Sequence, residues 1–181
     1  IKLGISMNLK TLLINPPQIF TKNQVAAGVT PPLGIAYLAS YLEDHDYPVQ
    51  IIDALGEAPE KIYPFKKGTY LRGLTFEDIL KRIDPEVRII GISNLFSFAY
   101  PAVEALCQII HKRFPDVTII LGGAHPSAMY ETILKDLPDV EYIVKGIEGE
   151  ESLLRLIMHL EGKLVFEELS GVATRDAQGV I

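Results

Sequence analysis

The sequence of 181 residues contains one cysteine, Cys107, and no tryptophan. A single cysteine cannot form a disulfide within the chain, and it cannot supply a four-cysteine zinc or iron–sulfur site. Basic residues are also few: 17 Lys and Arg against 23 Asp and Glu give a formal net charge of −6. The largest basic clusters are Lys66-Lys67 and Lys112-Arg113, so we expect no nucleic-acid partner. Every apolar run is too short for a membrane span.

What the sequence does have is the composition of a globular domain, with 48% hydrophobic and 22% charged residues. Its length suits one ordinary domain with its own core. The N-terminal residues lack the pattern of a secretory signal peptide, so we expect a cytoplasmic protein. Met7 is a candidate native start, which would make residues 1–6 added sequence. The alternative is that the sequence starts at an internal position of a longer gene.

Short apolar runs alternate with segments of helical periodicity. The runs predict strands at residues 11–14, 49–53, 87–93, 117–121 and 142–144. The periodic segments predict helices at residues 33–42, 74–83 with Thr75 as cap, 99–114, a segment through Ile133 and Leu137, and 150–160. This alternation predicts an α/β fold, Rossmann-like and flavodoxin-like, with a doubly wound five-stranded parallel sheet in the order 2-1-3-4-5. Phe166 and residues 171–181 predict a C-terminal β-hairpin that turns near residues 176–179.

Two connections are unusually long, residues 15–32 and residues 54–73. Long connections in a compact domain are usually functional or disordered. The first follows strand one, where a sheet of this order binds its ligands. The second contains Tyr63, Phe65 and Tyr70, so we expect it to pack against another part of the molecule.

The residues after the strands exclude several common functions of this fold. A receiver domain needs acidic residues after strand one and a phosphorylatable Asp after strand three, where this chain has Asn15 and Ser93. A dinucleotide-binding unit needs a glycine-rich turn after strand one, and a flavodoxin needs a loop rich in Ser, Thr and Gly. This chain has Asn15-Pro16-Pro17 there instead.

Candidate binding residues follow the third, fourth and fifth strands. The paired glycines Gly122-Gly123 allow close approach by a ligand or by another chain segment, and a tight strand-to-helix turn is the alternative. For Ser93 the alternative is an ordinary capping serine. His125 is a candidate for a hydrogen bond to a ligand, or it organises the turn before the next proline. Glu148 and Glu150 are either hydrogen-bond acceptors at this edge or acids favoured at a helix N-terminus.

Two resemblances then indicate a family. Residues 93–95 (Ser-x-Leu), a gap of 26 residues and Gly122-Gly123 resemble the second half of the signature of cobalamin-binding domains of the methionine synthase type. In that family the Ser and the two Gly line the slot for the nucleotide tail, and the corrin ring lies across the carboxyl edge of the sheet. The first half of the signature, Asp-x-His-x-x-Gly, is missing after strand one. Its His is the lower cobalt ligand in that family, so we do not expect that ligation here.

The second resemblance covers nearly the whole chain. Four motifs in order are similar to the N-terminal domain of cobalamin-dependent radical S-adenosylmethionine (SAM) enzymes: residues 13–17, 31–39, 122–127 and 144–150. Residues 146–150 depart from the family's Gly-Glu-Gly-Glu by one extra residue. The resemblance implies a cobalamin-binding domain over residues 1–163 and a terminal hairpin over 164–181 that leads toward an absent radical SAM barrel. That barrel would bind a [4Fe–4S] cluster and SAM through three cysteines, which this chain lacks.

The leading hypothesis is therefore a domain that holds cobalamin base-off, without a histidine below the cobalt. The domain would come from a methyltransferase-type or cyclase-type parent enzyme and would be inactive alone. The expected cofactor-binding residues are Asn15, Pro16, Pro17, Leu33, Gly34, Ser93, Asn94, Leu95, Phe96, Gly122, Gly123, Ala124, His125, Gly146, Glu148 and Gly149. No two His share ligand spacing, so no metal bound directly by the protein is expected. We also expect that a bulky residue at Gly123 abolishes binding but leaves the fold largely intact. The alternative is an interaction or small-molecule-sensing module without cobalamin.

Overall fold

A computed structural model describes residues 8–22, 28–66 and 68–180. These residues form a central six-stranded sheet in the order β3-β1-β6-β7-β8-β9. Its strands are β3 (Val49–Asp53), β1 (Lys10–Asn15), β6 (Val87–Ser93), β7 (Thr118–Gly122), β8 (Tyr142–Val144) and β9 (Val172–Ala173). The first five are parallel, which confirms the predicted order 2-1-3-4-5. The short strand β9 adds an antiparallel edge that the sequence did not predict.

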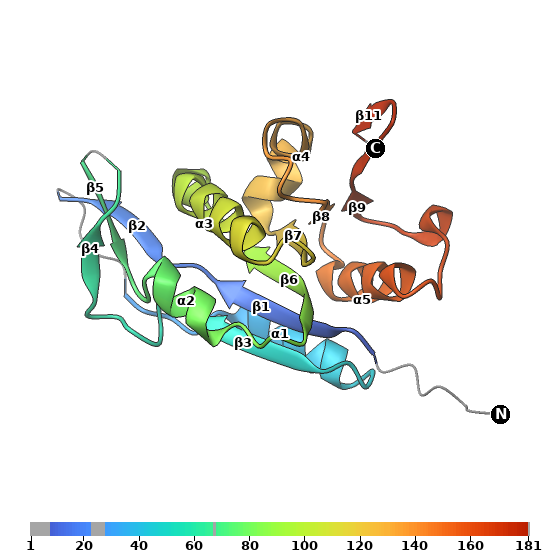
Figure 1. The fold of residues 1–181 in the computed structure, drawn as a ribbon, viewed down its shortest axis with the longest axis horizontal. Coiled ribbons are helices and arrows are strands. Elements are labelled where there is room, and N and C mark those ends of the chain that lie inside the picture. The colour runs from blue at the N-terminus through green and yellow to red at the C-terminus, as the bar shows by residue number, and fades with distance from the viewer. Residues whose placement is uncertain (1–7, 23–27, 67, 181) are drawn as a thin grey trace.

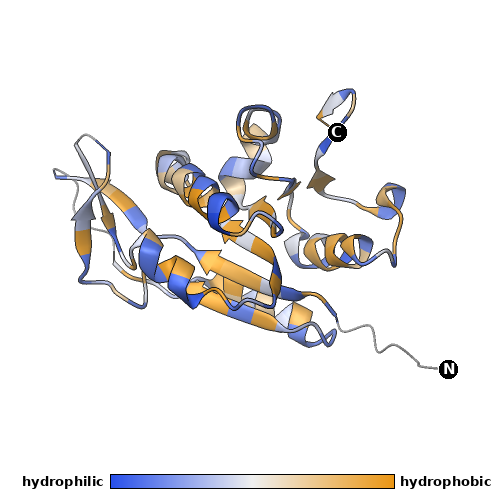
Figure 2. Cartoon of the chain, in the orientation of Figure 1, coloured by the Kyte–Doolittle hydropathy of each residue, from blue (hydrophilic) through white to orange (hydrophobic). Residues whose placement is uncertain are grey.

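Helices cover both faces of this sheet, as predicted. The α-helices of the described ranges are α1 (Leu33–Glu43), α2 (Phe76–Arg82), α3 (Tyr100–Arg113), α4 (Ala124–Asp136) and α5 (Gly149–Leu160). Helices α1 and α5 pack on one face, and α2, α3 and α4 pack on the other (Figure 1). The strands between them are accordingly hydrophobic over most of their length (Figure 2). No helix of the described residues is long and apolar enough to cross a membrane.

Local sequence explains where these elements begin and end. Leu12, Leu13 and Ile14 are at most 2% exposed, because helices cover β1 on both sides. The predicted cap at Thr75 is confirmed: its hydroxyl accepts from the Asp78 N–H at 3.1 Å. The Asp78 carboxylate in turn accepts from the Thr75 N–H at 3.2 Å, which completes a capping box. Cys107 lies on α3 as a free, fully buried thiol within the core.

The two long connections meet in a second sheet. It is antiparallel, in the order β2 (Gln18–Thr21), β5 (Thr69–Arg72) and β4 (Ile62–Pro64), and it extends beyond the carboxyl end of β1 (Figure 1). Ile19 and Leu71 bury their side chains against Ala102 of α3, and Tyr63 and Phe65 pack around them. The aromatic connection thus packs as expected, although the sequence did not predict its strands.

The predicted terminal hairpin is present as β10 (Arg175–Asp176) and β11 (Gly179–Val180). The Asp176 carboxylate accepts from the N–H groups of Gln178 and Gly179 and so stabilises the predicted turn. The Arg175 guanidinium donates to the carbonyl oxygens of Leu134, Pro138 and Val140, which fastens the hairpin to the end of α4. Met7, residues 1–6 and residues 23–27 of the first long connection lie outside the described residues.

Candidate functional site

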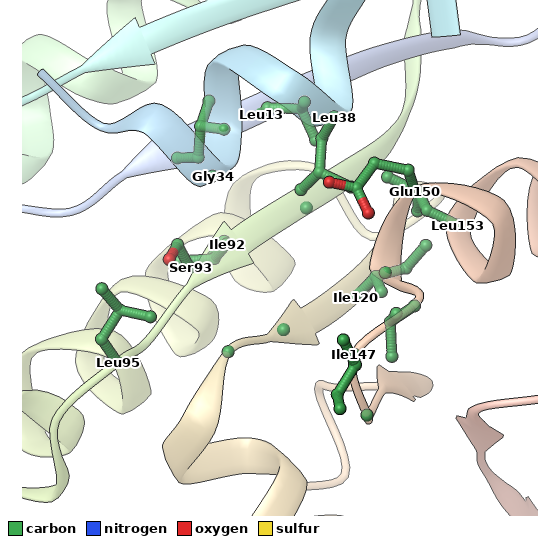
Figure 3. A pocket seen from close by; sticks show the side chains of 17 residues that line it. Leu13, Gly34, Leu38, Ile92, Ser93, Leu95, Ile120, Ile147, Glu150 and Leu153 are labelled. Carbon is green, nitrogen blue, oxygen red and sulfur yellow. The ribbon is translucent and has the colours of Figure 1, made fainter. Parts of the chain in front are cut away.

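A cavity of about 210 Å³ lies over the face of the sheet that α1 and α5 cover. It opens at the carboxyl ends of the strands, between the first turns of the two helices. Figure 3 shows lining residues from both helices, such as Leu38 on α1 and Glu150 on α5, together with Ser93 and Ile120 from the strands. The cavity is therefore at the edge where a doubly wound sheet binds its ligands.

The strand register explains the shape of the cavity floor. Gly91 of β6 pairs with Leu13 on one side and with Ile120 on the other, so these three residues lie side by side. Because Gly91 has no side chain, the Leu13 side chain lies over it: a Cβ atom on Gly91 would be 2.8 Å from the Leu13 Cδ2 atom. One pleat nearer the opening, Gly122 lies between Ser93 and Val144, and the space above it is open.

Several glycines around the cavity leave space that the chain itself does not fill. A Cβ atom built on Gly34, Gly146 or Gly149 would have no other atom within 4 Å, and one on Gly122 would meet only a backbone oxygen at 3.8 Å. Packing within the protein therefore permits a side chain at Gly34, Gly122 and Gly149, whereas the φ angle of +94° at Gly146 favours glycine there. What the glycines preserve is the open volume between α1, α5 and the sheet, which is the property expected of a ligand site.

Gly123 has a different role from its neighbour Gly122. Its φ angle is +110°, and a Cβ atom there would lie 2.6 Å from the backbone oxygen of Asn94. The Asn94 N–H donates to the Gly122 oxygen at 2.8 Å, and the His125 N–H donates to the Asn94 oxygen at 3.2 Å. Gly123 thus lets the ends of β6 and β7 pack together. The expectation that a bulky residue at Gly123 leaves the fold largely intact is corrected, because the backbone conformation there requires glycine.

The lining of the cavity is mostly apolar. Ser93 and Glu150 are the polar side chains among the described residues that line it. Glu150 lies in the first turn of α5, so it is both an acid at a helix N-terminus and a wall of the cavity. A flat, largely apolar group that needs few hydrogen bonds fits such a lining.

His125 lies away from the cavity, although it is close in sequence to Gly122. Its Nδ1 is 3.0 Å from the Ser97 hydroxyl oxygen, and its ring centroid is 4.8 Å from that of Tyr100. Burial lowers the pKa of the imidazole below its usual value and so favours the neutral ring. His125 thus helps to pack the start of α3 against α4 and does not line the cavity.

Residues of the first loop stabilise the structure around the cavity but do not line it. The Asn15 amide donates to the Asp53 carboxylate at 2.7 Å, which ties the end of β1 to the end of β3. Pro16 and Pro17 lead directly into β2 and do not line the cavity. Asn94 is 2% exposed and does not line it either; among the described residues, its side-chain oxygen and nitrogen have no hydrogen-bond partner.

Exposed apolar side chains lie in the cavity wall and in the segment that follows β6. Leu95 lines the cavity and is 59% exposed, and Ile147 lines it and is 99% exposed. Phe96 and Phe98 stack on each other at 5.4 Å between ring centroids, and both are more than half exposed. Clustered exposed apolar side chains are typical of surfaces that bind a ligand or another part of a protein.

The structure therefore divides the residues expected from the sequence. Those that line the cavity are Gly34, Ser93, Leu95, Gly122, Gly123, Gly146 and Gly149. Those that do not are Asn15, Pro16, Pro17, Leu33, Asn94, Phe96, Ala124, His125 and Glu148. Lining residues that the sequence analysis did not select are Leu13, Ile35, Leu38, Gly91, Ile92, Ile120, Val144, Ile147, Glu150 and Leu153. Of these, Glu150 was considered as a hydrogen-bond acceptor without being selected, and Gly91, a glycine inside a strand, is a further signal that the sequence offered.

Comparison with known proteins identifies a family and several relatives. The model of the B12 binding domain family matches residues 23–157. The chain is 32% identical over 177 residues to cytidylyl-2-hydroxyethylphosphonate methyltransferase of Streptomyces wedmorensis, a match that covers 95% of this chain and 32% of that protein. It is 28% identical over 176 residues to the anaerobic magnesium-protoporphyrin IX monomethyl ester cyclase of Synechocystis sp., covering 96% of this chain and 32% of that protein.

A solved structure is also similar. The cobalamin-dependent S-adenosylmethionine radical enzyme OxsB, with aqua-cobalamin and S-adenosylmethionine bound, superposes with a TM-score of 0.70 and 25% identity. That match covers 97% of this chain and 22% of the OxsB chain. The chain thus spans about a third or less of the length of these three proteins.

Proposed function

The chain belongs to the B12-binding domain family, and we propose that its cavity takes the nucleotide tail of a corrinoid whose ring lies across the carboxyl edge of the sheet. The observation that carries this proposal is the open volume beside Gly34, Gly122, Gly146 and Gly149. A side chain at Gly34, Gly122 or Gly149 would enter the cavity without disturbing the chain's own packing. A ligand therefore explains these three glycines, whereas Gly146 also has a φ angle of +94° that favours glycine.

The described residues fit such a cofactor on two counts. The cavity between α1 and α5 is apolar and of a size for a flat bicyclic base, and Ser93 supplies a hydroxyl within it. The patch of Leu95, Phe96, Phe98 and Ile147 beside the opening offers an apolar surface to the face or edge of a corrin ring. When bound, the corrinoid would supply a cobalt centre able to carry a methyl group or to change oxidation state.

The proposal includes a base-off corrinoid with no histidine on the cobalt. With its tail in the cavity, the cofactor's own base is held away from the metal. His125, the histidine nearest this edge in sequence, contacts Ser97 and Tyr100 and does not line the cavity. The protein would thus bind the corrinoid without a histidine ligand to cobalt.

For the whole protein we propose a radical SAM enzyme of the methyltransferase or cyclase type. The chain is homologous to a methyltransferase and a cyclase about three times its length and to a SAM radical enzyme. Residues 1–163 would form the cobalamin domain, and residues 164–181 would lead toward a barrel that carries the [4Fe–4S] cluster and SAM. With Cys107 buried and alone, this chain would be inactive by itself. A cytoplasmic location is also part of the proposal.

The test is a titration of the 181-residue chain with hydroxocobalamin, followed by visible absorption and by gel filtration. We expect a spectral change that saturates, together with co-elution of colour and protein. No spectral change and no co-elution at high micromolar corrinoid would contradict the proposal. The same titration with a flavin or a nicotinamide dinucleotide should give no binding, because the turn after β1 contains prolines in place of glycines.

A further inference from the structure

The loop between β8 and α5 places one large apolar side chain almost entirely in solvent. Ile147 is 99% exposed, more than any other large hydrophobic residue among the described residues, and it nevertheless lines the cavity. It is also the residue by which 146–150 exceeds the Gly-Glu-Gly-Glu pattern, because removing it leaves those four residues in order. Packing within the free chain therefore does not explain an isoleucine at this position.

The loop is fixed at its two ends. At its start, the Lys145 N–H donates to the Gly171 oxygen at 2.7 Å. At its end, the Ser152 N–H donates to the Glu148 oxygen at 3.0 Å, which joins the loop to the first turn of α5. Between these two bonds, a Cβ atom on Gly146 would have no other atom within 4 Å. The middle of the loop thus has room to change its conformation while both ends stay in place.

A second exposed apolar residue lines the cavity from the other side. Leu95 follows β6 and Ile147 follows β8, and Figure 3 shows them on opposite sides of the end of β7. Neighbouring strands are about 4.8 Å apart, so the two loops start about 10 Å apart. Gly122, at the end of β7, adds no side chain to the gap between them. Phe96 and Phe98 are also exposed, but they do not line the cavity.

We infer that Ile147 closes over the nucleotide tail of the bound corrinoid and, with Leu95 opposite, retains the tail in the cavity; this inference rests on the proposed function. In the free chain the Ile147 side chain is surrounded by water, so contact with the ligand removes apolar surface from water on both partners. Because this contact forms after the tail has entered, its loss should raise the dissociation rate more than it changes the association rate.

Ile147→Ser should therefore release hydroxocobalamin about 10- to 100-fold faster than wild type, the factor expected for an isoleucine that becomes buried on binding. The association rate should change by less than about threefold. The urea midpoint of unfolding of the free chain should stay the same, since almost none of the side chain is buried there. Ile147→Leu keeps the apolar surface and should release the corrinoid at nearly the wild-type rate.

The experiment loads the 181-residue chain with hydroxocobalamin and follows association and, after rapid dilution, dissociation by visible absorption. Val165→Ser is the matched control, because Val165 is 58% exposed, apolar and outside the cavity lining, so its variant should behave like wild type. A second measurement uses isoleucine labelled with ¹³C at the δ1 methyl group. The Ile147 resonance, assigned by its absence from Ile147→Leu, should show a nuclear Overhauser effect to protons of the nucleotide tail.

The outcomes separate this inference from the function on which it rests. If hydroxocobalamin does not bind to wild type, the corrinoid proposal itself fails. If it binds and Ile147→Ser releases it at the wild-type rate, or the Ile147 methyl group shows no contact with the tail, corrinoid binding stands and the inference is overturned. A lower unfolding midpoint in Ile147→Ser would mean that the side chain stabilises the free loop, which also overturns the inference.

Discussion

The backbone oxygen of Asn94 lies only 2.6 Å from the position that a Cβ atom would take on Gly123. The neighbouring Gly122 has no comparable contact, since its nearest atom would be 3.8 Å away. The pair therefore has two roles: Gly123 joins the carboxyl ends of β6 and β7, and Gly122 keeps the cavity open. Substitutions at the two positions should affect different measurable properties.

Gly122→Leu should abolish corrinoid binding and leave the fold intact. The first atom of the new side chain has room, and the rest would project into the cavity beside Ser93 and Val144. Hydroxocobalamin titration measures the binding, and circular dichroism with urea unfolding measures the fold. Ala128→Leu, at an exposed position on α4 outside the cavity lining, adds a leucine elsewhere and should bind like wild type. Tight binding by Gly122→Leu would mean that the tail does not enter this cavity.

Gly123→Ala should destabilise the protein itself. An alanine at φ +110° is strained, and its Cβ would press on the Asn94 backbone, so the cost should be about 2–3 kcal/mol. In a domain of this size that loss lowers the melting temperature by roughly 5–10 °C. Gly34→Ala is the matched control: its Cβ has free space in the first turn of α1, so the variant should be as stable as wild type or more stable. Equal stability of the two variants would contradict the structural role of Gly123.

Glu161→Gln should lower stability at neutral pH and matter less in acid. The Glu161 carboxylate is 5% exposed and accepts from Lys163 Nζ at 2.6 Å, from the Leu9 N–H at 2.8 Å and from the Tyr47 hydroxyl at 2.8 Å. Burial alone raises the pKa of this carboxyl, but the three hydrogen bonds outweigh it and hold the pKa below its usual 4.5. A carboxyl whose pKa is lower in the folded than in the unfolded protein stabilises the fold at pH values above its unfolded-state pKa. That stabilisation is lost as the pH falls through its folded-state pKa.

Glu161→Gln should lower the free energy of unfolding by about 1–2 kcal/mol at pH 7, as measured by urea unfolding. The difference from wild type should shrink as the pH falls from about 5 toward 3. Glu167→Gln, which changes an exposed carboxylate near the same end of α5, is the control and should show no such pH dependence. A loss that stays constant between pH 7 and pH 3 would show that ionisation of Glu161 does not stabilise the fold.

The main sheet was predictable because its signal is local. Each apolar run such as Leu12 to Ile14 is buried on both faces, and the alternation with helices leaves few possible strand orders. The sheet of β2, β5 and β4 was not predictable in the same way. Its strands come from two different connections, and their pairing depends on contacts such as Ile19 with Leu71, which no short window of sequence contains.

The site was only partly predictable for a related reason. Ser93 and Gly122 could be found because the carboxyl ends of parallel strands meet at one edge. The inner wall could not, since Leu13 and Ile120 are apolar and buried and so read in the sequence as ordinary core. His125 was misleading because the chain direction changes after a strand ends, and sequence alone does not say on which side of the sheet a turn residue lies.

The most direct test of the account is the electron paramagnetic resonance spectrum of cob(II)alamin bound to the chain. A nitrogen on the lower face of cobalt, from a histidine or from the cofactor's own base, splits the signal. The account predicts a spectrum without nitrogen splitting, identical in wild type and in His125→Ala, because the base occupies the cavity and His125 contacts Ser97. Nitrogen splitting in wild type that disappears in His125→Ala would contradict the histidine-free site, and splitting that persists would mean that the base stays on cobalt.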